Sequence, residues 1–216
     1  MKKFGRLVPR AFYNRDPRLV APELLGKILV RRNGRKILAG RIVEVEAYLG
    51  ANDPASHSFR GETPRNAVMF GPAGFVYVYF IYGNHYCLNV SCLPKGIAGG
   101  ILFRALEPLE GIEQMALARD ILVAGPKDLK NLTSGPGRLA EAFGITRLRD
   151  NGKDLTSKKS DLFIAEAVAE HPAKDYDRAR RVLTTPRIGI TKAAELPLRY
   201  VIAGNPFVSG RKLGSV

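Results

Sequence analysis

The sequence predicts an α+β fold in which strands and helices are mixed in a single domain. Its 216 residues fit one domain, and a hydrophobic content of 45% can fill a sizeable core. Strand-like alternation recurs between short helical segments, and no internal repeat, low-complexity tract or linker divides the chain. We therefore expect one domain over residues 1–216.

A short helix followed by a hairpin is predicted at the start of the chain. Asp16 is suited to cap a helix that begins at the following proline, and Gly26 is suited to end it. Within residues 27–40, two strand-like segments flank Asn33-Gly34, a pair that supplies the positive φ angles of a type I′ turn.

Residues 41–49 alternate as a strand does. One face would carry Val43, Val45, Ala47 and Leu49, and the other Ile42, Glu44, Glu46 and Tyr48. We expect the first face to be core and the second to carry chemistry. Residues 50–66 are rich in turn formers and contain Arg60 and Arg65, so we expect a long functional loop there.

A second hairpin is predicted between residues 75–81 and 86–92, with Gly83-Asn84 as its turn pair. The remaining elements are expected as a strand at 101–106, helices at 108–123 and 136–143, a loop at 144–160, and strands near 161–167, 186–190 and 198–202.

Charge favours a polyanionic partner. The chain has 34 Lys and Arg against 20 Asp and Glu, with a pI near 10.0, which favours nucleic acid. Neither an export signal nor an apolar run as long as a membrane span is visible. Cys87 and Cys92 are not spaced as a C-x-x-C pair, so we expect free thiols in a reducing compartment.

The second hairpin raises two interpretations of Tyr82. An aromatic ring at a hairpin tip, beside basic residues, could enter DNA and fill the gap left by an extruded nucleotide. The alternative is a ring packed on its own hairpin.

Other candidate residues also have two interpretations. Glu46, near several tyrosines, could be a general base that activates water, or Glu44 and Glu46 could simply decorate an exposed face. Residues 134–138, SGPGR, could bind phosphate at a helix start or be an ordinary cap. The scattered histidines and cysteines disfavour a metal site.

Several segments resemble the alkyladenine DNA glycosylases, also called 3-methyladenine DNA glycosylases. They are RIVEVEAYLG (41–50), HSFRGETPRN (57–66), MFGPAGFVYVYFIYGNHYCLNVS (69–91), LFRALEPLEG (102–111), SGPGRL (134–139) and PRIGI (186–190). The similarity extends from about residue 7 to 209 and is looser through 144–185. It implies a curved antiparallel β-sheet flanked by helices, with a protruding β-hairpin.

The same resemblance implies a function. Such enzymes flip damaged purines out of duplex DNA and hydrolyse the N-glycosidic bond without a metal or organic cofactor. By position, Glu46 is similar to the family's general base, with Arg104 and the main-chain carbonyl of Ile188 holding the attacking water. Tyr82 is similar to the intercalating residue, and His85 follows it in the segment expected to enter DNA.

The resemblance also assigns a pocket and a backbone contact. The base-binding residues would be Tyr48, His57, Tyr79, Asn89 and Leu102, and the DNA-backbone residues Arg65, Ser134, Gly135 and Arg138. The sequence departs from the vertebrate pattern in two places: the 57–66 segment is one residue shorter, and Asn84-His85-Tyr86 follow Gly83 where bulkier apolar residues stand. The resemblance therefore assigns neither a lesion preference nor a wedge depth.

Two other functional classes stay open at this point. A non-catalytic nucleic-acid-binding module would explain the charge, but it would leave Glu46 without a role. A bifunctional glycosylase-lyase would need a nucleophilic lysine, and none occurs in residues 41–91. We expect a monomeric, monofunctional enzyme on double-stranded DNA, with no membrane association, in the cytoplasm or nucleoid of a prokaryote or the nucleus of a eukaryote.

Overall fold

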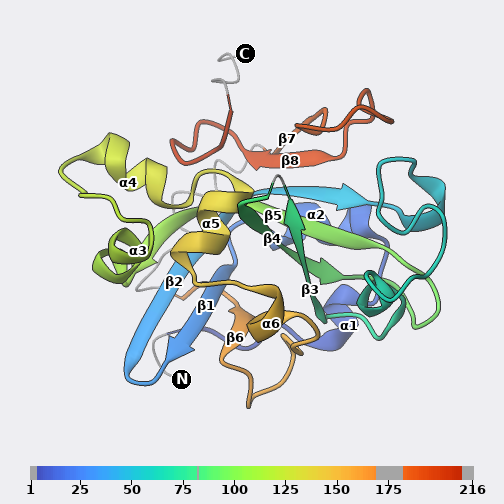
Figure 1. Ribbon diagram of the computed structural model, residues 1–216, viewed down its shortest axis with the longest axis horizontal. Coiled ribbons are helices and arrows are strands. Elements are labelled where there is room, and N and C mark those ends of the chain that lie inside the picture. The colour runs from blue at the N-terminus through green and yellow to red at the C-terminus, as the bar shows by residue number, and fades with distance from the viewer. Residues whose placement is uncertain (1–3, 82, 169–181, 211–216) are drawn as a thin grey trace.

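An eight-stranded antiparallel sheet organises the computed structural model, which describes residues 4–81, 83–168 and 182–210 (Figure 1). The strands are β1 (Ile28–Asn33), β2 (Lys36–Tyr48), β3 (Val76–Ile81), β4 (His85–Ser91), β5 (Gly100–Glu110), β6 (Leu162–Ala165), β7 (Val182–Thr185) and β8 (Arg199–Ile202). Their order is β3-β4-β5-β2-β1-β6, and β8 pairs with both β2 and β7.

Short helices cover parts of this sheet. They are α1 (Arg10–Tyr13), α2 (Pro17–Leu24), α3 (Ile112–Ala118), α4 (Pro126–Thr133), α5 (Pro136–Ala142) and α6 (Arg147–Asp150), with 3₁₀ turns η1 (Gly50–Asn52) and η2 (Ala67–Phe70). None of the helices found in the described ranges has the length and apolar character needed to cross a membrane.

Strand β2 produces the curl of the sheet. Residues 36–41 of β2 pair with β1 and residues 44–46 pair with β8, while β5 occupies the other edge of the strand. The register between β2 and β5 shifts around Glu44, and such bulges increase the local twist. The expected α+β fold with a curved antiparallel sheet is confirmed.

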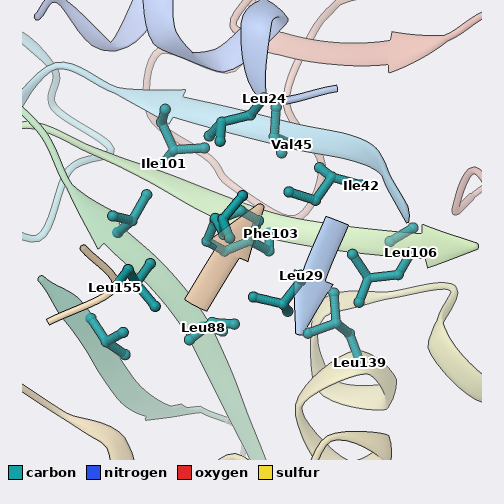
Figure 2. Packing of buried hydrophobic residues seen from close by; sticks show 14 of the residues in the cluster. Leu24, Leu29, Ile42, Val45, Leu88, Ile101, Phe103, Leu106, Leu139 and Leu155 are labelled. Atoms are coloured by element: carbon teal, nitrogen blue, oxygen red, sulfur yellow. The ribbon is translucent and has the colours of Figure 1, made fainter. Parts of the chain in front are cut away.

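The main hydrophobic core lies on one face of the sheet. Figure 2 shows Val45 of β2, Leu88 of β4, and Ile101 and Phe103 of β5 in this cluster, with Leu24 of α2 packed close by. The alternation expected for 41–49 is confirmed from Val43 onward. It is wrong for Ile42, which joins the core because the bulge at Glu44 interrupts the two-residue period.

Both predicted hairpins form, but each turn differs from its prediction. Asn33 pairs with Lys36, so the first turn is Gly34-Arg35. Of these two only Gly34 has a positive φ, 61°, which fits a type II′ rather than a type I′ turn. In the second hairpin, Ile81 pairs with His85 across a three-residue connection.

The tip of the second hairpin protrudes from the sheet. Gly83 and Asn84 are exposed, and a Cβ atom built on Gly83 would meet no described atom within 4 Å. Tyr82, the proposed wedge, lies outside the described residues.

Most helix predictions hold, and one fails. The helix after Asp16 is confirmed, because the Asp16 carboxylate accepts from the Arg18 N–H, and α5 begins at Pro136 as expected. The helix expected at 108–123 is wrong at both ends, since Pro108 lies in β5 opposite Gly40 and α3 ends at Ala118. Long-range pairing with β2 therefore outweighs the local helical pattern.

Three further local differences separate structure from prediction. The strand expected near 186–190 is absent from these described residues, which are irregular, and β7 precedes them. The loop expected at 144–160 contains the short helix α6. Helix α4 was not anticipated, although Pro126 follows Gly125 in the way a helix start does. Cys87 and Cys92 are free and buried.

We expect Phe103→Ala to lower the free energy of unfolding by about 3–5 kcal/mol, because it would leave a large cavity in the core. Phe103 is fully buried, whereas Leu148 is 100% exposed and provides a matched control. Leu148→Ala should change stability by less than about 0.5 kcal/mol. Urea denaturation of both variants tests this, and equal losses would contradict the assignment of the core.

Candidate active site

Polar and aromatic side chains occupy the face of the sheet opposite the main core. Successive strand residues point to opposite faces, so one row of neighbours can be read from the register. Tyr77 lies opposite Asn89, Asn89 opposite Leu102, and Leu102 opposite Glu46. These four residues come from β3, β4, β5 and β2, so the curled sheet itself assembles the site.

A cavity of about 520 Å³ opens beside this row. This volume lies within the range of small-molecule sites and could hold a nucleobase. The sequence-predicted residues that line the cavity are Tyr48, His57, Tyr79, His85, Asn89, Leu102, Arg104, Ser134, Gly135, Arg138 and Ile188. Residues far apart in the chain therefore meet around one space.

Glu46 is fully buried and has three hydrogen-bonding or charged partners. The Tyr48 hydroxyl donates to its Oε2 at 3.0 Å, and the Ile188 N–H donates to its Oε1 at 2.8 Å. A guanidinium nitrogen of Arg104 lies 3.2 Å from the same Oε1. The interpretation in which Glu44 and Glu46 decorate an exposed face is wrong, because neither side chain is exposed.

Glu44 lies behind Glu46 and completes a balanced charge cluster. Its carboxylate accepts from the Nε of Arg104 at 2.9 Å and from the Nε of Arg199 at 2.7 Å. The N–H and hydroxyl of Ser209 donate to it as well. Two carboxylates are thus matched by two guanidinium groups, which offsets the cost of burying like charges together.

The protonation states of the partners of Glu46 follow from this setting. Burial and the nearby Glu46 raise the pKa of Tyr48 far above its ordinary value, so its hydroxyl keeps its proton and remains a donor. Burial opposes the charge of Arg104, yet Glu46 and Glu44 more than offset it and raise the pKa of that guanidinium. Both groups therefore donate toward the Glu46 carboxylate.

Aromatic rings form one wall of the cavity. The His57 ring lies 4.5 Å from the Tyr79 ring, centroid to centroid, and its Nδ1 is 3.1 Å from the Tyr77 hydroxyl. Although the residue is exposed to solvent, partial desolvation of the ring and the charge of Arg65 lower the pKa of His57 below its ordinary value. Burial also raises the pKa of Tyr79, so the wall is uncharged at neutral pH.

Asn89 and Leu102 form the floor of the cavity, and the Asn89 side chain hydrogen-bonds to the main chain. The Asn89 side-chain amide donates to the carbonyls of Tyr77 and Cys87, at 3.2 and 3.3 Å. Leu102 beside it is 3% exposed. These contacts restrict where the Asn89 side chain can lie.

His85 and helix α5 form the rim on the hairpin side. A Cβ atom built on Gly137 would lie 2.9 Å from the His85 ring, so the absence of a side chain there allows close packing. Arg138 is exposed, and its guanidinium donates to the Asn131 side chain at 3.0 Å.

The amides of Ser134 and Gly135 are already engaged within the protein. They donate to the main-chain carbonyls of Lys130 and Arg104, at 3.1 and 2.9 Å. A ligand contact of this segment would therefore have to use groups other than these two amides.

Arg65 is not among the residues that line the cavity. It is exposed, and burial raises the pKa of Tyr77 while the positive charge of Arg65 partly offsets that rise. Its charge therefore acts on the outer edge of the aromatic wall.

Sequence reasoning missed several residues that the structure brings to the site. Asp53 and Arg187 form a fully buried ion pair at the edge of the cavity, and Arg199 supports Glu44. Asp53 ends a 3₁₀ turn in the loop expected to be functional, and Arg187 lies in the PRIGI segment. The sequence therefore indicated that both segments belong to the site. It could not indicate that Asp53 and Arg187 pair, because no spacing rule relates residues 134 positions apart.

No group of three or more His, Cys, Asp or Glu side chains among the described residues is arranged to hold a metal ion. The acidic groups of the site instead face arginines.

Comparison with known proteins gives consistent matches over nearly the whole chain. The sequence profile of the family described as Methylpurine-DNA glycosylase (MPG) matches residues 11–206. A protein of Koribacter versatilis is 64% identical over 205 residues, covering 95% of this chain and 94% of the relative. One from Burkholderia cenocepacia is 49% identical over 95% of this chain and 92% of its own.

A relative from Methanoculleus marisnigri is 47% identical over 94% of this chain and 99% of its own length. All three relatives have the name "Putative 3-methyladenine DNA glycosylase".

We expect the imidazole of His57 to titrate below its ordinary value of 6.5, and Arg65→Gln to move that pKa upward by removing a nearby positive charge. An NMR pH titration of the His57 ring measures both values. Arg60→Gln removes an exposed arginine of the same loop and should leave the pKa of His57 close to that of the parent. Equal effects of the two variants would show that Arg65 does not act on His57.

Proposed function

This chain belongs to the methylpurine-DNA glycosylase family, and from that premise we propose how it acts. It is a DNA-3-methyladenine glycosylase, a hydrolase of the N-glycosidic bond, and takes part in DNA repair. The proposal is that it flips a damaged purine out of duplex DNA, hydrolyses its glycosidic bond without lyase activity, and so initiates base excision repair.

The single observation that carries the proposal is the environment of Glu46. Its carboxylate is fully buried, accepts from Tyr48 and Ile188, pairs with Arg104, and lies beside a cavity large enough for a base. A binding module would have no need to bury a carboxylate beside its pocket, because such burial is costly unless every partner is in place.

Glu46 is proposed to act as the general base. It removes a proton from water, the water oxygen bonds to the sugar C1′, and the C–N bond breaks with its electron pair retained by the purine. A purine made cationic by alkylation leaves as a neutral molecule, and the DNA retains an abasic site. Arg104 and the Ile188 carbonyl are proposed to hold the attacking water.

The cavity walls fit a flat base. Tyr48, His57 and Tyr79 can stack on or around it, and the rings attract a cationic purine when water is excluded. A neutral His57 adds no repulsion to that cation. Asn89 is proposed to crowd the amino group of normal guanine, and Leu102 to close the wall.

DNA docking is proposed to use the rim of the cavity. Arg65, Arg138 and the Ser134-Gly135 segment would contact the phosphate backbone, supported by the net charge of +14. Tyr82 would fill the vacated stack, with His85 beside it. Ile81 and His85, the described residues that bound the hairpin connection, line the cavity, which supports this location.

Monofunctional chemistry is favoured over a glycosylase-lyase. A lyase needs an amine nucleophile to form a Schiff base, and the cavity lining in the described residues contains no lysine. We further propose that residues 1–216 act as one monomeric domain without a cofactor, inside the cell and associated with DNA.

We expect Glu46→Gln to lower base excision at least about 100-fold, because the amide cannot accept the proton from water. Binding to lesion-containing duplex should survive, since the phosphate contacts remain. Single-turnover release of an alkylated purine and a gel-shift titration measure the two quantities. Excision near the parent rate would refute the role of Glu46.

We expect Tyr82→Ala to reduce the flipped population, because it removes a stacking contact of about 1–3 kcal/mol. A fluorescent base analogue beside the lesion reports flipping, and a thermal melt of the same preparation reports folding. A destabilised variant with normal flipping would mean that the ring packs on its own hairpin.

A further inference from the structure

A buried ion pair joins two loops on the cavity rim. The side chains of Asp53 and Arg187 are both 0% exposed. The second guanidinium nitrogen of Arg187 donates to Asp53 Oδ1 at 2.9 Å, and the first donates to Oδ2. Such a bidentate contact fixes the orientation of the guanidinium as well as its distance from the carboxylate. Asp53 follows η1, and Arg187 lies in the irregular segment after β7.

The Asp53 side of this pair organises the loop that carries His57. Its carboxylate also accepts from the N–H groups of Leu49 and Ala55, at 3.2 and 3.0 Å. Residues 55–58 line the cavity directly after it. Burial opposes the charge of Asp53, but the bonds from Arg187 and the two amides offset it and lower the pKa of Asp53.

The Arg187 side of the pair reaches two partners of Glu46. Its guanidinium carbon lies 4.6 Å from the centroid of the Tyr48 ring. A guanidinium nitrogen also donates, at 3.1 Å, to the carbonyl of Ala47, the residue between Glu46 and Tyr48 in β2. The next residue along the chain, Ile188, donates its N–H to Glu46. One side chain therefore restrains the Tyr48 ring and the peptide that contacts Glu46.

Residues 186–190 have no sheet ladder to hold them. Among the contacts of the described residues, Arg187 ties this segment to Asp53, Ala47 and Ala193, and the Ile188 amide ties it to Glu46. Irregular backbone held by a few contacts is readily displaced when one of them is lost.

We infer that Asp53 and Arg187 are positioning residues, whose ion pair holds the Ile188 amide and the Tyr48 ring in place on Glu46 and locks the two rim loops together. This inference rests on the proposed function, because it assigns the pair to the setting of the general base. Neither residue touches the reacting atoms. Displacing Glu46 or its water by as little as about 1 Å would cost roughly 100-fold in rate.

The test uses Arg187→Gln and Arg187→Lys in the full chain. We expect the single-turnover excision rate of Arg187→Gln to fall about 10- to 100-fold, with the Kd for lesion duplex within about threefold of the parent. The amide of Ile188, measured by NMR hydrogen exchange, should exchange faster than in the parent. Arg187→Lys keeps the positive charge but lacks the planar guanidinium group, so its excision rate should fall less than that of Arg187→Gln.

Arg31→Gln is the matched control, because Arg31 also forms a buried ion pair, with Asp150 at 2.9 Å, on the β1 side of the sheet. It should lower stability but keep the parent excision rate and slow Ile188 exchange. If Arg187→Gln matches this control, or loses excision while Ile188 stays protected, the inference is wrong. If Arg187→Gln does not fold, Arg187→Lys decides between the same outcomes.

The experiment separates this inference from the proposed function. An inactive parent protein would refute the glycosylase proposal, whereas the exchange rate of the Ile188 amide requires no activity. An unchanged Ile188 exchange rate in Arg187→Gln would refute the positioning role even if the parent excises damaged bases.

Discussion

Glu44 and Glu46 are buried side by side, and the arginines around them offset the free-energy cost of burying two negative charges. Like charges without water repel strongly, and an unpaired buried charge costs several kcal/mol. Arg104 lies between the two carboxylates, and Arg199 supplies the second positive charge. Arg104 comes from β5 and Arg199 from β8, so the two strands that pair with opposite edges of β2 each contribute one cation.

The curl of the sheet brings these charged groups together. β2 carries the carboxylates, and it must meet β5, β1 and β8 within one strand length. The register shifts around Glu44 bend the strand there. The convex and concave faces then separate by chemistry, since odd residues from Val43 to Ala47 enter the core while Glu44, Glu46 and Tyr48 face the site.

Irregular segments supply contacts to the site that the strands do not provide. Glu46 accepts a hydrogen bond from the Ile188 N–H, and Ile188 lies in a segment that forms no β-sheet hydrogen bonds. A main-chain N–H committed to a β-ladder could not turn toward a carboxylate, so the absence of a strand at 186–190 is useful to the site. The Asp53–Arg187 pair then replaces the ladder as the restraint on this backbone.

The sequence by itself determined the elements whose cause is local. Capping by Asp16, the alternation after Val43 and the two hairpins follow from neighbouring residues, and the motifs identified Glu46, Arg104 and the aromatic positions as a group. Only the tertiary structure decided the strand at Pro108 and the partners Glu44–Arg199 and Asp53–Arg187. Those features depend on contacts between distant residues, whose energies compete with local preference and leave no fixed spacing in the chain.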